Sequence, residues 1–265
     1  MAKDFLWPHL SALPYFRAML RAVEARLMQE VELPPPVLDI GSGDGHFATV
    51  AFDHPLDVGI DPDRGVMREA ARRGGYRLLV RTPGARLPVA DGAFASAISN
   101  SVLEHIPHLM PVLVEVNRAL RMGAPFAFTV PNPGYRTELS LPRRLRRLRL
   151  PWLATAYADW FMRMSRTRNL FYEDGWGERL ATSGFEVERT FRYFSPQALA
   201  VLEWGHYFGA PCLVPRRVVG RWILAPQRWS LWLTERLVRR YYDESPSALG
   251  TYSFYLARKV RDAAD

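Results

Sequence analysis

The sequence has 265 residues, 48% of them apolar, which is enough for one large α/β domain or for a domain with a substantial insertion. Its formal net charge of +8 comes almost entirely from arginine, since Lys3 and Lys259 are the only lysines. This charge suits nucleic acid, anionic membrane or acidic substrates without deciding among them. The single cysteine, Cys212, excludes an intrachain disulfide and a cysteine-based zinc cluster.

No run of the sequence approaches the ~18 apolar residues that a membrane span needs, and the first residues lack the basic-then-apolar pattern of a signal peptide. We therefore expect a cytoplasmic protein without a transmembrane segment. Residues 12–30 carry apolar side chains at helical spacing and predict an amphipathic helix within an N-terminal helical cap, residues 1–33. A lid over a ligand cleft and a plain packing helix both stay open as interpretations of this segment.

Residues 37–47 organise the chain. An apolar run, Val37 to Ile40, breaks into the alternate glycines Gly41, Gly43 and Gly45 and then into a helical pattern. Glycine accepts positive φ and lets a ligand approach the backbone, and the N–H groups of the following helix point at whatever binds there. The spacing is Gly-x-Gly-x-Gly with Asp39 before it, so it differs from the Gly-x-Gly-x-x-Gly fingerprint of dinucleotide-binding proteins. A glycine turn in another kind of α/β protein remains an alternative.

Strands and helices alternate after this loop. Strands are predicted at 56–60, 76–80, 95–99 and 125–130, with helices at 47–52, 64–73 and from Leu109 to Leu120. This alternation predicts a parallel, doubly wound sheet with helices on both faces. Asp61 follows the second strand, where an acid can accept hydrogen bonds from ribose hydroxyls. Capping of the helix 64–73 is its alternative role, although Asp63 is better placed for that.

Three further segments carry a specific resemblance: Leu87-Pro88 with Phe94, Val102-Leu-Glu-His-Ile106, and Arg118-Ala-Leu-Arg-Met-Gly123. Together with the glycine loop they resemble the class I S-adenosylmethionine-dependent methyltransferases of the ubiquinone/menaquinone type, over residues 36–133 and again from Phe171 to Glu188. The resemblance implies a Rossmann-like seven-stranded sheet of order 3-2-1-4-5-7-6 whose last strand is antiparallel. It also implies S-adenosyl-L-methionine as the cofactor.

The same resemblance implies roles for individual residues. Gly41, Ser42 and Gly43 would cradle the methionine part of the cofactor, and Asp39 would support that loop or the amine. Asp61 would hold the ribose. The remaining cofactor-binding positions are Gly45 in the loop, Pro62 beside Asp61, Gly84 and Ala85 at the adenine, and Asn100 and Ser101 at the methionine end. Two departures, Pro83 and Ala95 in place of acidic residues, leave the adenine to backbone and apolar contacts.

Two long insertions depart from the family pattern within what we expect to be a single methyltransferase domain, residues 1–265. Residues 134–170 are basic and aromatic, and residues 196–248, between the sixth and seventh strands, are rich in Trp, Tyr and Arg. Aromatic rings interleaved with arginine favour a membrane interface or a long-chain substrate. An ordinary substrate lid stays open, and nucleic acid is disfavoured because the sequence contains no recognisable binding module.

His105 is the candidate general base, because it follows the fourth strand near the expected cleft. The competing interpretation is a histidine that braces its loop beside Glu104. His206, Tyr207 and Trp160 in the insertions are candidate substrate contacts, and no spacing of His, Asp and Glu indicates a metal site.

The leading hypothesis is therefore methyl transfer from S-adenosylmethionine to a hydrophobic small molecule, such as a lipid, quinone or polyketide-like acceptor. The insertions would cap the cleft and provide a peripheral contact with anionic membrane. The alternatives are a soluble methyltransferase for a polar metabolite and a homologue that binds the cofactor without catalysis.

Overall fold

The computed structural model describes residues 3–263, which form two compact units. The first, called here the helical unit, combines the N-terminal residues up to Met28 with Gly134–Met164 and Arg192–Tyr252. The second, called the sheet unit, combines Gln29–Pro133, Ser165–Phe191 and the chain from Ser253 onward. Each unit is described by itself.

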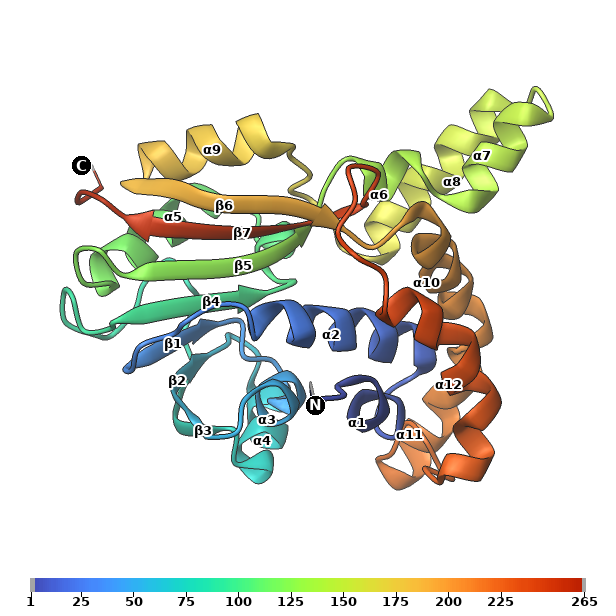
Figure 1. Ribbon diagram of the computed structural model, residues 1–265, viewed down its shortest axis with the longest axis horizontal. Helices are drawn as coiled ribbons and strands as arrows, with labels where there is room; N and C mark the ends of the chain where they lie inside the picture. The colour runs from blue at the N-terminus through green and yellow to red at the C-terminus, as the bar shows by residue number, and fades with distance from the viewer. Residues whose placement is uncertain (1–2, 264–265) are drawn as a thin grey trace. The chain divides into compact units, whose positions relative to one another are not determined.

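The sheet unit is built on seven strands in the order β3-β2-β1-β4-β5-β7-β6. This confirms the fold and the strand order predicted from the sequence. The arrows in Figure 1 show β7 running opposite to its neighbours. The strands are β1 (Val37–Ile40), β2 (Leu56–Ile60), β3 (Tyr76–Val80), β4 (Ser96–Asn100), β5 (Pro125–Pro131), β6 (Phe185–Tyr193) and β7 (Tyr252–Lys259).

Parallel pairing in register joins the first five strands. Leu38 of β1 lies between Val58 of β2 and Ala97 of β4, and Leu56 of β2 pairs with Tyr76 of β3. The carboxyl ends of β1 and β2 therefore meet at one edge of the sheet, which is where parallel α/β sheets bind their ligands.

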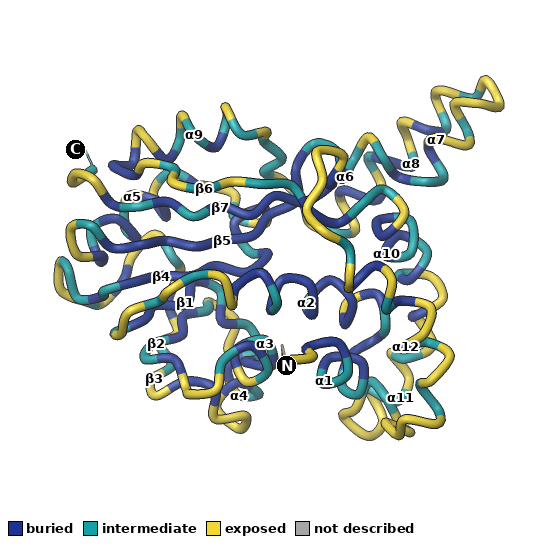
Figure 2. Tube along the Cα trace, viewed as in Figure 1, coloured by how far each residue is buried: buried dark blue, intermediate teal, exposed yellow. Residues whose placement is uncertain are grey.

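Four helices surround the sheet: α3 (His46–Ala51), α4 (Arg64–Arg73), α5 (Leu109–Ala119) and α9 (Glu173–Thr182). The core beneath α5 and α9 is aromatic, since the ring of Phe128 lies 4.9 Å from that of Tyr255 and 5.0 Å from that of Trp176. Strands β4 and β5 are buried along almost their whole length, as the dark blue of Figure 2 shows. Such a core holds the loops at the carboxyl edge of the sheet on a rigid base.

The helical unit contains α1 (Leu6–Leu10), α2 (Tyr15–Met28), α6 (Gly134–Thr137), α7 (Ser140–Arg147), α8 (Pro151–Met164), α10 (Pro196–Phe208), α11 (Leu213–Val219) and α12 (Arg228–Tyr242). It is therefore made of the N-terminal helices and the two segments expected as insertions. Glu203 of α10 is fully buried and accepts hydrogen bonds from the backbone N–H groups of Ser140 and Leu141. Phe16 of α2 packs directly against Gly205 of α10, where a Cβ atom would collide with its ring.

Candidate functional site

The glycine loop, residues 41–45, leaves β1 in a conformation that only glycine adopts freely. Gly41, Gly43 and Gly45 have φ of +82°, +53° and +74°. The N–H groups of Gly41 and Ser42 both donate to the carbonyl of Ile60, each at 2.9 Å, and so tie the loop to the end of β2. Hydrogen bonds within the chain therefore hold the loop to the neighbouring strand.

The surroundings of the loop are tight at its ends and open in the middle. A Cβ atom on Gly41 would lie 2.5 Å from the side chain of Val102, and one on Gly45 would lie 3.0 Å from Ala70 Cα. A Cβ atom on Gly43 would meet only Gly41 O, at 3.9 Å. Ser42 Oγ is buried and has no hydrogen-bond partner within residues 3–263. An open stretch of backbone beside an unsatisfied hydroxyl is suited to a polar ligand.

Asp61 joins the second strand to this loop. Its Oδ2 accepts a hydrogen bond from the Gly43 N–H at 3.1 Å, and its Oδ1 accepts one from the Asp63 N–H at 2.8 Å. Capping of α4 falls to Asp63, whose Oδ1 accepts from the N–H groups of Gly65 and Val66. This confirms Asp63 as the cap. Pro62 lies exposed between the two acids.

Asp39 has a partner that the sequence did not suggest. The Tyr76 hydroxyl donates to Asp39 Oδ2 at 2.5 Å, and both side chains are buried. Burial, together with the neighbouring Asp39 carboxylate, raises the pKa of Tyr76 far above its ordinary value, so the hydroxyl remains a donor. Gly59 leaves room for the ring, since a Cβ atom there would lie 2.7 Å from Tyr76. Asp39 is thus held under the loop by a buried tyrosine.

The loop that carries Gly84 and Ala85 is held by a hydrogen bond within the loop and by a close contact with α5. The Thr82 hydroxyl donates to the carbonyl of Arg86 at 2.6 Å. A Cβ atom on Gly84 would lie 3.1 Å from the side chain of Val112 on α5, so the backbone of this loop approaches the helix closely. Ala85 is exposed.

Asn100 and Ser101 end β4 at the same edge as the glycine loop. Asn100 is buried, and its Oδ1 accepts a hydrogen bond from the hydroxyl of Thr129 at 2.9 Å. Ser101 has a φ of +50°, and its N–H donates to Thr129 O at 3.0 Å. A non-glycine residue at positive φ marks a turn that its surroundings hold in place.

His105 has contacts on both ring nitrogens. Nδ1 lies 3.1 Å from the carbonyl oxygen of Arg166, and Nε2 lies 3.7 Å from Glu104 Oε1. The His105 side chain is 44% exposed. These contacts suit a histidine that braces two segments, while the exposure leaves the ring accessible to an acceptor.

The three candidate substrate residues all belong to the helical unit, and two of them contact each other. The ring of Trp160 stacks on Tyr207 at 6.1 Å, and the Tyr207 hydroxyl lies 2.7 Å from that of Tyr157. His206 packs its ring 4.5 Å from Phe16, and burial lowers the pKa of His206. No group of three or more His, Cys, Asp or Glu side chains in the described part of the chain could hold a metal ion.

The sheet unit also resembles known proteins in sequence. Residues 38–128 match the model of a family described as a methyltransferase domain. A protein of Mycolicibacterium gilvum, described as an uncharacterized methyltransferase, is 39% identical over 99 residues, which are 36% of this chain and 39% of that protein. An uncharacterized methyltransferase of Mycobacterium tuberculosis is 35% identical over 96 residues, 34% of this chain and 38% of its own. The match spans less than half the length of these curated relatives.

Solved structures match over most of the chain at low identity. A methyltransferase of Thermotoga maritima, described as a possible histamine N-methyltransferase, has a TM-score of 0.53 at 13% identity and covers 97% of this chain and 93% of its own. The geranyl diphosphate C-methyltransferase of Streptomyces coelicolor A3(2), solved with S-adenosyl-L-homocysteine, has a TM-score of 0.51 at 15% identity, covering 89% and 75%. The [4+2]-cyclase SpnF has a TM-score of 0.55 at 18% identity, covering 92% and 81%. These similarities concern the fold, and the cyclase shows that one fold hosts different reactions.

Proposed function

This chain carries a class I methyltransferase domain, the family whose cofactor is S-adenosylmethionine, and we propose that it transfers a methyl group from that cofactor to a hydrophobic small molecule. The observation that carries the proposal is the glycine loop, which presents open backbone at Gly43 and is bonded there to Asp61. The family match begins at β1 and includes this loop.

The residues present fit such a cofactor. The unsatisfied Ser42 hydroxyl offers a polar contact to its methionine part, and the open space at Gly43 lets that part approach the backbone. A carboxylate has about four lone-pair positions, and Asp61 uses two of them on backbone N–H groups. The others are available to ribose hydroxyls. Asn100 and Ser101 at the end of β4 complete the proposed contacts, with Gly84 and Ala85 beside the adenine.

The bound sulfonium supplies a methyl carbon that is already activated for displacement. The work left to the chain is to align the acceptor and to exclude water. A general base is required only if the acceptor loses a proton as it reacts. His105 is our candidate for that role, with Nε2 as the atom that would take the proton when Nδ1 donates to the Arg166 carbonyl.

The helical unit supports a hydrophobic acceptor. It exposes large apolar side chains that its core does not use, among them Trp229 at 80%, Val218 at 77% and Phe208 at 70%. Exposed aromatic and aliphatic side chains gathered on one unit favour contact with apolar molecules. The candidate substrate contacts Trp160, His206 and Tyr207 belong to this unit.

Peripheral contact with anionic membrane is the second part of the proposal. The outward face of α12 carries Trp229, Trp232 and Leu233 together with Arg236, and α7 carries exposed arginines. Trp at headgroup level and Arg on anionic lipid are the usual means of interfacial binding. No helix in the described part of the chain combines the length and the apolar character that crossing a bilayer requires.

Vesicle sedimentation tests this contact. Trp229→Ala with Trp232→Ala should reduce pelleting with anionic vesicles several-fold, and neutral vesicles should pellet little of the wild type. Leu78→Ala, which removes an exposed apolar side chain of β3 in the sheet unit, is the control. Equal pelleting of all three proteins would remove α12 from the membrane contact.

The reaction itself is tested by incubating the protein with methyl-labelled S-adenosylmethionine and with lipid and aqueous extracts of its host. Label in the organic fraction supports the proposal. Label confined to water-soluble products would assign a polar acceptor. Binding of the cofactor, measured by calorimetry, without transfer to either fraction would leave a non-catalytic cofactor-binding protein.

A further inference from the structure

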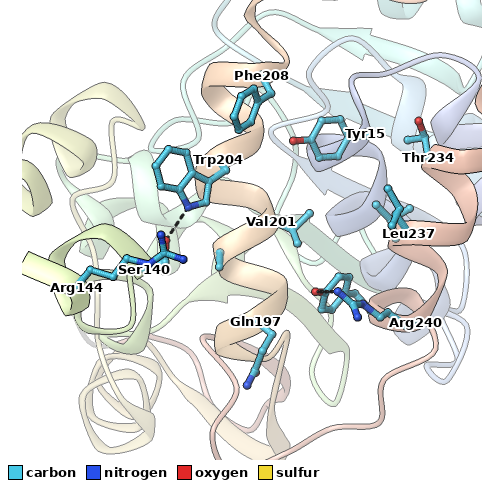
Figure 3. Close-up of a pocket in the computed structure, with 13 residues that line it drawn as sticks. Tyr15, Ser140, Arg144, Gln197, Val201, Trp204, Phe208, Thr234, Leu237 and Arg240 are labelled. Atoms are coloured by element: carbon cyan, nitrogen blue, oxygen red, sulfur yellow. Dashed lines mark hydrogen bonds between the residues drawn. The ribbon is translucent and has the colours of Figure 1, made fainter.

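A cavity of about 620 Å³ opens within the helical unit along one face of α10. Figure 3 shows its lining: Val201, Trp204 and Phe208 project from α10, with α7 on one side and α2 and α12 on the other. Pockets of roughly 300–1,000 Å³ are the size that small organic ligands occupy. Because every lining residue belongs to the helical unit, the cavity is a property of that unit alone.

The lining is mostly apolar and is left open to solvent. Phe208 is 70% exposed and Leu237 of α12 is 56% exposed, although both are large hydrophobic side chains. The indole of Trp204 is held in place, since its Nε1–H donates to Ser140 Oγ at 2.9 Å and its ring lies 6.1 Å from that of Phe208. A fixed aromatic wall beside exposed aliphatic groups is suited to a hydrocarbon chain.

The charged side chains that line this cavity are both arginines: Arg144 on α7 and Arg240 on α12. Within residues 3–263 the structure records no carboxylate bonded to either guanidinium. Arg240 instead donates to the hydroxyl of Tyr241 and lies 4.5 Å from the centre of its ring. Both guanidinium groups therefore keep donors for an anion.

The acidic residues of the helices that form the walls are engaged elsewhere. Glu203, the one acid of α10, holds the backbone at the start of α7. Glu235, the one acid of α12, is bonded to Arg239 at 2.5 Å. Glu24, the one acid of α2, is fully buried and paired with Arg21 at 3.2 Å, and α7 contains no acid. The cavity therefore offers apolar walls and a positive electrostatic potential.

We propose that this cavity binds a single-chain anionic amphiphile, with the hydrocarbon chain along Val201, Trp204 and Leu237 and a carboxylate or phosphate head at Arg144 or Arg240. A cationic ligand would find no partner of opposite charge in the lining. The site is argued from the helical unit alone, and its occupancy is measured without S-adenosylmethionine. It therefore holds or fails separately from methyl transfer.

Calorimetry with dodecyl phosphate and laurate, each below its micelle concentration, tests the proposal on the full chain. Both should bind, while dodecyltrimethylammonium should not. Full burial of a methylene contributes about 0.8 kcal/mol to the binding free energy, and a half-open groove contributes about half of that. Each two methylenes added to the hydrocarbon chain should therefore tighten binding about fourfold. Comparison of the two heads separates a carboxylate ligand from a phosphate ligand. Equal binding of anionic and cationic chains would overturn the proposal.

Matched variants locate the site. Val201→Trp fills the cavity and should weaken dodecyl phosphate binding at least tenfold. Of Arg144→Gln and Arg240→Gln, the variant that removes the guanidinium holding the head should weaken it to the same extent. Val218→Trp and Arg147→Gln are the controls, because they make the same kinds of change at exposed positions outside the cavity lining. Circular dichroism checks folding. If Val201→Trp does not fold, Leu237→Asp at an exposed position takes its place.

Two further outcomes would overturn the proposal. Binding unchanged in the cavity-filling variant and in both arginine variants would show adsorption elsewhere on the surface. Sedimentation velocity measures whether the chain is a dimer. If it is, and if Val201→Trp abolishes the dimer while dodecyl phosphate does not dissociate it, a second copy of the chain covers this face. A monomer that binds one amphiphile per chain supports the proposed amphiphile site.

Discussion

Asp61 and Asp63 are two acids on one turn that the structure uses differently, so they form a matched pair of mutants. Each accepts two backbone hydrogen bonds: Asp61 from Gly43 and Asp63, and Asp63 from Gly65 and Val66. Replacing either by Ala should cost about 1–2 kcal/mol of folding stability, because two backbone N–H groups lose their acceptor. Stability therefore cannot distinguish them.

Affinity for the cofactor should distinguish them. If Asp61 accepts both ribose hydroxyls, Asp61→Ala loses two charge-assisted hydrogen bonds of at least ~1.5 kcal/mol each, or about a hundredfold in Kd. The Asp63 carboxylate caps the start of α4, so Asp63→Ala should change the Kd for the cofactor less than threefold. Asp61→Asn, which keeps one acceptor oxygen, should fall between the two.

Isothermal titration with S-adenosyl-L-homocysteine measures both variants, and the melting temperature of each without ligand reports the shared loss of stability. A Kd that is unchanged in Asp61→Ala would refute the ribose assignment. Equal losses of affinity in the two variants would show that the turn acts only through its fold, which would refute it as well.

Three other predictions concern Tyr76, His105 and His206. Tyr76→Phe removes the donor to the buried Asp39 carboxylate and should lower the free energy of unfolding by about 1.5–3 kcal/mol, as measured by urea denaturation; an unchanged midpoint would mean that the bond contributes nothing. His105→Gln should lower kcat about a hundredfold or more at unchanged cofactor Kd if His105 is a base, whereas a lower melting temperature with normal kcat would identify a brace. Because burial lowers the pKa of His206 from 6.5, the unfolded chain binds its proton first, so stability should fall as the pH drops below about 6.5. His206→Gln should flatten that part of the pH profile, and an identical profile would contradict the burial argument.

Most of the sheet unit could be predicted because its signals are local. The strands Leu56–Ile60 and Tyr76–Val80 have the predicted bounds, since glycine, proline or aspartate flanks each apolar run. The fourth strand lies one residue later than expected, at Ser96–Asn100, because Ala95 is still in the turn whose N–H donates to Pro36 O. A turn at these glycines is predicted because glycine accepts positive φ, and all three loop glycines have a positive φ.

Contacts between distant segments could not be predicted in the same way. The bond between Asp39 and Tyr76 spans 37 positions and depends on Gly59 leaving room for the ring. Likewise, a glycine such as Gly205 lowers the helix propensity of its segment. Only the packed structure shows that the missing side chain leaves room for Phe16. The arginine-lined cavity of the helical unit unites segments from α2, α7, α10 and α12, so composition could indicate its chemistry but not its existence.

The double use of Asp61 bears on how a ligand would bind. If a ligand had to order the loop, the binding free energy would become less favourable by about 1–2 kcal/mol for each residue fixed. Here the chain already holds the loop at its start, through the N–H groups of Gly41 and Ser42 that donate to Ile60 O, and at its middle, through the Gly43 N–H that donates to Asp61. Since the carboxylate that fixes Gly43 is also the proposed acceptor for the ribose, the loop and the sugar contact would be positioned by one group. Binding should then occur with little backbone movement at residues 41–45, and hydrogen exchange at Gly43 should be slow before any ligand is added.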